Sequence, residues 1–434
     1  MSLQSTPQSS RYWIGLFGRR NSGKSTLMNL LCDQPVSLVS AEAGTTTDPV
    51  TKSIEIKGLG PVVLVDTAGY DDVGHLGQAR VERSEASVDR VHFAVLLLRP
   101  SCLLERASSN SDEVPSSPDW SQELAWIRRF AKQKAPWLLA VNLAEADLKA
   151  GDGSDALLPS FLEKLRQEAL PQPSGQILLD LHCAEARQTF VQALLQAVKA
   201  SQSEQCDSSP ASLTASLCGA GDHVLLVMPQ DIQAPAGRLI LPQVQTIREL
   251  LDKHCFVSAV TANEYPAVLS LFQQAPSLII TDSQVFPHVW AHKPAESRVT
   301  SFSILMAAFK GDIELFRQGA EVLPKLGANS RVLIAEACSH VPLQEDIGRV
   351  KIPRLLRDRI SPDITIDIMS GNDWPSAEKL ASYDLVIHCG ACMFNRPHVL
   401  ARLRQLESAS VPITNYGIAL AWFAGILDKV ALPL

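Results

Sequence analysis

The feature that most constrains the fold is an eight-residue segment near the start of the chain, GRRNSGKS at residues 18–25. It matches the pattern G-x-x-x-x-G-K-[ST], in which backbone N–H groups and a helix N-terminus surround phosphate groups. The apolar segment Tyr12–Phe17 before it predicts a strand, and Ser25–Leu31 predicts the start of a helix. This strand–loop–helix order predicts an α/β domain that binds a nucleotide.

The loop itself supplies contacts to phosphate and metal. Lys24 is expected to reach the β- and γ-phosphates, and Ser25 is expected to hold Mg²⁺. The loop residues that surround the phosphates with them are Asn21, Ser22, Gly23 and Thr26. The competing interpretation is a chance glycine-containing turn, and the partner motifs that follow in order argue against it.

Two further segments complete the predicted catalytic set. Asp66 follows the strand predicted at Pro61–Val65, where its carboxylate can reach Mg²⁺, and the amide of Gly69 can bind a γ-phosphate oxygen. Between the two motifs lies the segment GTTTD (44–48), from which we choose Thr46 as the residue that closes over the metal. A threonine-rich segment is also typical of an ordinary polar turn.

A nucleotide-base motif follows the strand predicted at Trp137–Val141. Asn142-Leu-Ala-Glu145 resembles the N-K-x-D motif of translation-factor-type GTPases. Leu143 replaces the lysine that packs on the guanine and the phosphate loop, and Glu145 replaces the aspartate with a carboxylate one methylene longer. We expect a preference for guanine, and an ordinary strand-to-helix cap is the alternative.

Three other positions bear on nucleotide recognition and hydrolysis. Cys183-Ala184-Glu185 resembles the S-A-K loop whose alanine amide binds the guanine O6. Tyr70 stands where Ras-like enzymes carry a water-positioning glutamine, so we expect slow hydrolysis. Asn21 resembles the asparagine of the K⁺-activated GTPases of the TrmE and Era class, in which K⁺ takes the place of an arginine finger. Asparagine is also a common turn residue, so K⁺ stimulation is a hypothesis.

A second group of chemically active residues lies in the C-terminal part of the chain. Cys338-Ser-His340 follows the predicted strand Arg331–Ala335, and His388-Cys389-Gly-Ala-Cys392 follows the predicted strand Leu385–His388. The carboxyl ends of parallel strands form the ligand-binding edge of an open α/β sheet, so we expect the two groups to converge. The C-x-x-C spacing lets two thiolates face one metal centre. Cys392 is also predicted to open a helix, whose dipole would favour a thiolate.

Three interpretations of this group remain open on chemistry alone. A structural zinc ion would take three cysteines and one histidine. An iron–sulfur cluster would take the three thiolates and leave its fourth position to a weaker ligand, which could be His340, His388, a nearby carboxylate or water. The third interpretation is an inert cluster of buried thiols with helix-capping histidines.

Composition limits the class of protein, and polar stretches indicate how the chain is divided. Hydrophobic residues make up 46% of the 434, and Lys+Arg 39 against Asp+Glu 46 gives a net charge of −7, which argues against a nucleic-acid partner. Without an apolar run of membrane length or a secretory signal, we expect a cytoplasmic protein with no membrane partner. The polar stretch 201–216 predicts a linker, so we expect the chain to divide into a first part (1–200), a linker (201–219), a middle part (220–326) and a last part (327–434).

The combination of motifs resembles the HydF family of [FeFe]-hydrogenase maturation GTPases. Besides the motifs, the segments that carry the resemblance are 237–248, 335–340, 346–353, 386–392 and 412–417. It implies a phosphate-loop GTPase domain (1–200) followed, after the linker, by two further α/β domains with largely parallel sheets. These are a dimerisation domain (220–326) and an iron–sulfur cluster-binding domain (327–434). It also implies GTP, Mg²⁺ and a [4Fe–4S] cluster on Cys338, Cys389 and Cys392.

The resemblance further implies a role as scaffold and carrier. Two radical-SAM enzymes would build a transient di-iron precursor, which this chain would pass to the apo-[FeFe]-hydrogenase. The middle domain would form a homodimer, through an edge strand that pairs across a two-fold axis. The alternatives are an RNA-modification or ribosome-assembly GTPase with a structural zinc site, and a GTPase-linked interaction protein whose Cys/His group is inert.

Overall fold

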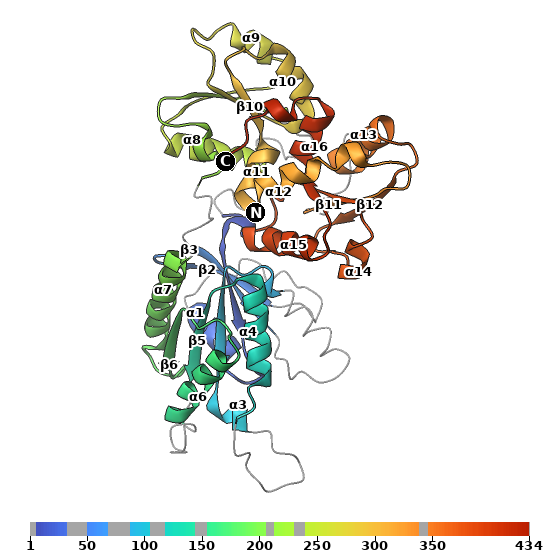
Figure 1. Cartoon of the computed structure of the whole chain (residues 1–434). Helices are drawn as coiled ribbons and strands as arrows, with labels where there is room; N and C mark the ends of the chain where they lie inside the picture. The colour runs from blue at the N-terminus through green and yellow to red at the C-terminus, as the bar shows by residue number, and fades with distance from the viewer. Residues whose placement is uncertain are drawn as a thin grey trace. The chain divides into compact units, whose positions relative to one another are not determined.

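The computed structural model describes residues 6–32, 50–67, 87–104, 118–143, 154–204, 212–229, 239–337 and 346–433. The chain divides into two compact units, Met1–Ser208 and Ser209–Leu434 (Figure 1). Strands and helices alternate in both units, as the sequence predicted.

The first unit contains the predicted phosphate-loop order of strand, loop and helix. Its described elements are η1 (Gln8–Ser10), β1 (Tyr12–Phe17), α1 (Lys24–Cys32), β2 (Val50–Ile56), β3 (Gly60–Asp66), β4 (Phe93–Leu98), α3 (Pro100–Leu104), α4 (Ser121–Gln133), β5 (Trp137–Asn142), α6 (Ser154–Gln167), β6 (Gly175–Leu179) and α7 (Ala186–Glu204).

These elements form a sheet covered on both faces (Figure 1). The strand order is β2-β3-β1-β4-β5-β6, and every neighbouring pair is parallel except β2 with β3. Helices α1 and α7 pack on one face through Leu27 and Phe190, and helices α4 and α6 pack on the other through Phe130 and Phe161. Strands buried on both faces are continuous apolar runs, which is why β4 (FAVLLL) is buried along its whole length.

The second unit begins with a four-stranded sheet. The elements up to its last strand are η2 (Ala215–Leu217), β7 (His223–Val227), α8 (Leu241–Asp252), β8 (Phe256–Val260), α9 (Tyr265–Leu269), β9 (Leu278–Thr281), η3 (Ser283–Val285), α10 (Phe286–His292) and β10 (Arg298–Ser301). The order β10-β9-β7-β8 is parallel throughout, so β8 is an edge strand.

A second four-stranded parallel sheet follows in the same unit, in the order β12-β11-β13-β14. Its elements and the helices before it are α11 (Phe302–Lys310), α12 (Ile313–Ala320), η4 (Leu323–Lys325), β11 (Arg331–Glu336), a π-helical turn η5 (Ile347–Lys351), α13 (Ile352–Arg359), β12 (Thr365–Ser370), α14 (Ala377–Leu380), β13 (Leu385–His388), α15 (Arg396–Ser408), β14 (Ile413–Asn415), α16 (Tyr416–Phe423) and η6 (Leu427–Lys429). The fold class predicted from the sequence is confirmed.

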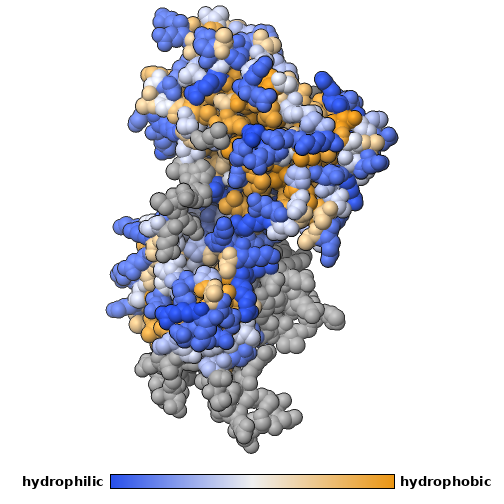
Figure 2. All heavy atoms as spheres, in the orientation of Figure 1, coloured by the Kyte–Doolittle hydropathy of each residue, from blue (hydrophilic) through white to orange (hydrophobic). Residues whose placement is uncertain are grey.

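One hydrophobic core joins the two sheets of the second unit. It contains Leu225 and Ile279 of the first sheet together with Val332 and Leu385 of the second. The apolar helices α11 and α16 pack against each other, and Figure 2 shows hydrophobic residues gathered around them. Among the helices that the structure describes, none has the length and apolar character needed to cross a membrane.

Two sequence-based expectations about helices are wrong. The sequence has a long helical pattern from about Leu305 to Leu326, which predicts a single helix. The structure has two helices there, because the chain leaves the helical conformation at Gly311 and the Asp312 carboxylate caps α12 by accepting from the N–H of Leu315. Cys392 does not open a helix either. Helix α15 begins at Arg396, where the Asn395 side chain accepts from the N–H of His398.

Candidate functional site: nucleotide pocket and cysteine loop

The phosphate loop connects β1 to α1 and needs an unusual backbone. Gly18, Asn21 and Gly23 have φ angles of 144°, 59° and 105°. A Cβ atom on Gly23 would lie 2.8 Å from Asn142 Nδ2 and 2.7 Å from Leu181 Cδ1. Glycine is therefore required at position 23 both for the backbone angle and for close packing.

The predicted phosphate and metal ligands come together at this loop. Lys24 is buried, and its Nζ donates to the carbonyls of Gly18 at 2.9 Å and Arg19 at 2.7 Å. Ser25 Oγ donates to Asp66 Oδ2 at 2.6 Å. The hydroxyl and the carboxylate are the oxygen ligands that Mg²⁺ prefers, so their contact fits a shared metal ion.

Three buried polar atoms around the loop lack a partner among the described residues. They are Ser22 Oγ, Asp66 Oδ1 and Asn142 Oδ1. The amide nitrogen of Asn142 donates to the carbonyl of Ser22 at 3.2 Å, which ties the end of β5 to the phosphate loop. Buried polar atoms are normally hydrogen-bonded, so a cluster of unpaired ones fits a site that a polar ligand completes.

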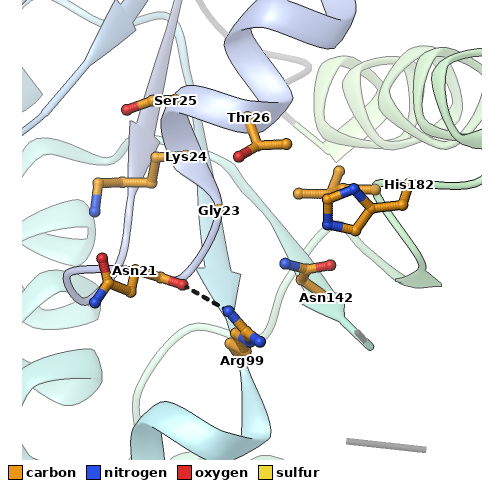
Figure 3. A pocket seen from close by; sticks show the side chains of 9 residues that line it. Asn21, Gly23, Lys24, Ser25, Thr26, Arg99, Asn142 and His182 are labelled. Carbon is orange, nitrogen blue, oxygen red and sulfur yellow. Dashed lines mark hydrogen bonds between the residues drawn. The ribbon is translucent and has the colours of Figure 1, made fainter. Parts of the chain in front are cut away.

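These residues surround a pocket of about 350 Å³ (Figure 3), a volume in the range of small-molecule sites. Its lining is Asn21, Gly23, Lys24, Ser25, Thr26, Arg99, Asn142, Leu181 and His182. Arg99, whose Nη1 lies 3.5 Å from the carbonyl oxygen of Asn21, and His182 were not identified from the sequence. Arg99 directly follows β4, and His182 lies in the turn after β6, so a polar residue just beyond the end of a strand is the signal that could have identified them.

The remaining nucleotide-site predictions have different outcomes. Leu143, at the place of the expected lysine, packs against the core between the sheet and helices α4 and α6. Cys183 and Ala184 lie exposed in the turn before α7. The predicted residues Thr46, Gly69, Tyr70 and Glu145 lie outside the described part of the chain.

A buried ion pair holds the phosphate loop against α4. Arg19 donates through Nε to Glu123 Oε1 at 2.7 Å and through Nη2 to Glu123 Oε2 at 2.9 Å. Both side chains are buried, and Arg19 also donates to the carbonyl of Asp119. Two hydrogen bonds to one carboxylate fix the orientation of the Arg19 guanidinium, so α4 holds the backbone of the phosphate loop at residue 19.

The two cysteine groups of the second unit follow neighbouring parallel strands. Ala335 of β11 is paired with His388 of β13, and the N–H of Cys389 donates to the carbonyl of Ala335 at 2.9 Å. The N–H of Ala337 donates to Cys389 Sγ at 3.1 Å. Cys338 is the next residue after Ala337, although Cys338 and His340 lie outside the described residues. The expected placement of both groups at one sheet edge is therefore consistent with the strand register.

The segment Cys389–Phe394, which we call the cysteine loop, places two half-buried thiols near each other. Ala391 has a φ of 52°, and its N–H donates to Cys389 Sγ at 3.4 Å. Burial, followed by the nearby charge of Cys392, raises the pKa of the Cys389 thiol to about 11. Two neighbouring thiols, one of which accepts from backbone N–H groups, can lose their protons to a metal centre and bind it as thiolates. The described residues contain no complete group of three metal ligands.

His388 is held by hydrogen bonds at both ring nitrogens. Arg402 Nη1 lies 3.2 Å from Nε2, and because a guanidinium only donates, Nε2 accepts and Nδ1 carries the proton that it donates to the carbonyl of Cys389 at 2.9 Å. Burial, and then the charge of Arg402, lowers the pKa of His388 to about 3.

Arg402 itself was not singled out by the sequence. Its guanidinium lies between the rings of Trp374 and Phe394, at 4.2 and 4.5 Å from their centroids, and donates to the carbonyl of Gly371 at 2.7 Å. It occupies an interior position of α15, where an arginine usually faces solvent, so no local pattern indicates its burial.

Comparison with protein families accounts for most of the chain. Residues 13–142 match the family model described as 50S ribosome-binding GTPase. Residues 213–311 match the hydrogen maturase F dimerization domain, and residues 314–433 match the hydrogen maturase F tetramerization domain. The latter two matches together span slightly more than half of the chain. The chain belongs to the hydrogen maturase F (HydF) family. Its first unit is thus a GTPase domain, and its second unit comprises the two HydF domains, whose boundary falls at the break between α11 and α12.

Curated relatives match part of the chain. The tRNA modification GTPase MnmE of Myxococcus xanthus is 30% identical over 194 residues, which are 44% of this chain and 41% of that protein. MnmE of Leptospira biflexa is 37% identical over 96 residues, 22% of this chain and 21% of that protein. The chain thus spans between about a fifth and two fifths of these relatives. A solved structure of Era in complex with MgGDPNP and 16S ribosomal RNA is 16% identical, with a TM-score of 0.31 over 60% of this chain and 98% of Era.

Proposed function

We propose that the protein binds and hydrolyses GTP in its first unit and carries a [4Fe–4S] cluster in its second. From the cluster edge it would pass the di-iron precursor of the active site to apo-[FeFe]-hydrogenase. The observation that carries this proposal is the match to both HydF domains, together with the strand register that brings the segment before Cys338 against Cys389.

In the GTPase reaction the chain would supply charge and orientation. Lys24 would leave the two loop carbonyls that it contacts and bind the β- and γ-phosphates. Ser25, Asp66 and Thr46 would hold Mg²⁺, and the amide of Gly69 would bind the γ-phosphate. Without a water-positioning glutamine the reaction is slow, and a K⁺ ion at Asn21 would supply the missing positive charge.

On the base side, Asn142, Glu145 and the loop at Cys183 and Ala184 would recognise guanine. Leu143 packs into the core and cannot reach the phosphate loop as the usual lysine does. Arg99 lines the same pocket and approaches the loop carbonyl of Asn21, so we assign it the role of that lysine. Its planar cation suits contact with a base.

In the second unit Cys338, Cys389 and Cys392 would hold the cluster. When bound, the cluster supplies iron sites whose reduction potential depends on neighbouring charges and on hydrogen bonds to sulfur. Cys389 Sγ already accepts from the N–H groups of Ala337 and Ala391, which fits such a ligand. Because both nitrogens of His388 are hydrogen-bonded, we assign it to orienting the cysteine loop and keep His340 as the candidate fourth ligand.

A homodimer would form through the middle domain. Edge strand β8 leaves its backbone unpaired on one side among the described residues, and Phe256 on it is 68% exposed. Val244 and Leu251 of α8 are exposed as well, which gives the edge an apolar border. The tetramerization-domain match extends the proposal to a dimer of dimers. The other proposed partners are two radical-SAM enzymes. We propose that the protein meets them in the cytoplasm.

The dimer proposal predicts that Phe256→Asp weakens self-association at least about tenfold, because a carboxylate would be buried in an apolar contact. Light scattering over a concentration series measures this change. Leu271→Asp is the matched control, since Leu271 is 77% exposed but lies after α9 rather than on β8. A Phe256→Asp variant that associates like the native chain would refute the assignment of β8.

The whole proposal is tested on protein purified without oxygen. We expect about four iron and four sulfide per chain, the paramagnetic signal of a reduced [4Fe–4S] cluster, and activation of apo-hydrogenase when the two radical-SAM enzymes are present. A colourless protein that holds zinc and activates nothing would instead support a GTPase related in role to the tRNA modification relatives. A protein that holds neither iron nor zinc would instead support a GTPase-linked interaction protein whose Cys/His group is inert.

A further inference from the structure

Lys310, the last residue of α11, is buried against the cysteine loop. Only 2% of its surface is exposed. Its Nζ donates to the carbonyl oxygens of Ala391 and Cys392 at 3.0 Å each and of Phe394 at 2.5 Å. An ammonium group has three N–H donors, so all of them are used by this one loop.

The arrangement depends on the loop conformation. Ala391 adopts a φ of 52°, a region that non-glycine residues seldom occupy, and the carbonyls on either side of the turn converge on Lys310. Arg396, just after the loop, donates through Nη1 to the carbonyl of Phe309 at 2.7 Å. Two cationic side chains therefore join the end of α11 to the cysteine loop.

Burying a charged lysine side chain costs free energy, so we expect a buried lysine to have a structural or functional role. Burial lowers the pKa of Lys310 to about 8, whereas the charges of Cys392 and Cys389 act to raise it. Its hydrogen-bond acceptors among the described residues are neutral carbonyls, and the nearby groups that become negative when they bind a metal are the two cysteines. The helix dipole that the sequence suggested at Cys392 is absent, because α15 begins four residues later. Lys310 is thus the positive charge that is hydrogen-bonded directly to the backbone of this loop among the described residues.

We propose that Lys310 is a positioning residue that fixes the cysteine loop, and that its ammonium charge favours the reduced form of the cluster bound there. Reduction adds an electron, and therefore negative charge, which a nearby cation in a water-poor setting stabilises. Lys310 also belongs to the segment that matches the dimerization domain, so the loop of one HydF domain is held by the helix of the other. This inference rests on the proposed cluster.

The test compares two substitutions in the full-length protein. Lys310→Gln removes the charge and keeps donors, whereas Lys310→Arg keeps the charge. Lys293→Gln is the matched control, because Lys293 Nζ also donates to two backbone carbonyls, of Pro294 at 2.7 Å and Ala295 at 3.0 Å, outside the cysteine loop. Each variant is reconstituted anaerobically, its iron and sulfide are measured, and the cluster is titrated electrochemically and examined by EPR.

We expect Lys310→Gln to lower the ratio of reduced to oxidised cluster at a fixed potential about tenfold, which corresponds to about 59 mV for a one-electron couple. Its EPR signal should also change, because the loop is less firmly held. Lys310→Arg should keep the ratio within about threefold of the native protein, and Lys293→Gln should change neither readout. GTP hydrolysis should be the same in all three variants.

Three outcomes would overturn the inference. The first is a Lys310→Gln variant with a full cluster and a native reduced-to-oxidised ratio. The second is a Lys310→Arg variant whose ratio falls as far as that of Lys310→Gln. The third is loss of iron from both Lys310 variants, because a residue needed only for folding behaves in that way. Absence of iron from the native protein would instead refute the proposed function itself, before any variant is made.

Discussion

The nucleotide pocket and the cysteine loop occupy equivalent places, since each lies at the carboxyl ends of parallel strands, but they are built in opposite ways. Around the phosphate loop, three buried polar atoms have no partner among the described residues. At the cysteine loop, Cys389 Sγ accepts two N–H groups, Lys310 donates three hydrogen bonds and His388 is bonded at both nitrogens. The first site leaves polar groups for an exchangeable ligand, and the second uses its polar groups to hold the loop.

Because the two sites are built differently, we expect them to respond differently to substitution. A change in the phosphate loop removes a contact to the ligand and leaves the surrounding unit in place. A change in the cysteine loop removes a partner from a connected set of hydrogen bonds and affects several residues together. The substitutions described below test this separation.

Lys24→Ala gives the largest expected effect. Removing the phosphate-binding cation should lower the rate of GTP hydrolysis about 100-fold or more. Iron content should stay native, because the pocket and the cysteine loop lie in separate compact units. Phosphate release and iron analysis on the same preparation check both parts. Loss of iron in this variant would break the separation of the two sites.

Cys389→Ser is the reciprocal test. Most of the cluster should be lost, about a tenfold drop in iron, since an alcohol is a poor ligand for a site built from thiolates. Hydrogenase activation should vanish while GTP hydrolysis persists. Cys32→Ser, at the end of α1, is the control that should keep its iron. Full cluster assembly in Cys389→Ser would exclude this loop as the cluster site.

Glu123→Gln tests how far the phosphate loop depends on distant support. The substitution leaves the buried Arg19 without its carboxylate, which should lower the free energy of unfolding of the first unit by about 3 kcal/mol. Urea denaturation followed by tryptophan fluorescence measures the change. Nucleotide binding should weaken too, because Arg19 supplies one of the carbonyls that Lys24 contacts. A loss below about 0.5 kcal/mol would show that the loop holds its shape without α4.

The choice of monovalent cation gives the smallest expected effect. At matched ionic strength, hydrolysis should be about tenfold faster in K⁺ than in Na⁺ if Asn21 helps to hold the ion. Asn21→Gly is the matched variant, because it keeps the φ of 59° accessible and removes only the side-chain amide. Equal rates in the two salts for the native protein would assign Asn21 to turn geometry alone.

Much of this architecture can be predicted from sequence because the signals are local. A few consecutive residues are enough to identify the phosphate-loop motif, the helix after it, and Asp66 at the end of a strand. The breaks were harder to predict. An apolar pattern continues through Gly311, and only the cap by Asp312 begins a new helix. The helix expected at Cys392 starts at Arg396, because Asn395 provides the cap and Pro397 suits the first turn.

The groups that can bind phosphate or metal are recognisable from the sequence: a phosphate loop, a carboxylate after a strand, and cysteines at two strand ends. The side chains that surround these groups become known only once the chain is folded. Folding brings Arg99 to the phosphate loop, Arg402 to His388, and Lys310 to a loop 81 residues further along the chain. The physical reason is that backbone geometry and strand ends are set by near neighbours. The burial of a cation instead depends on which distant carbonyls, rings and imidazoles converge on it after the core has packed.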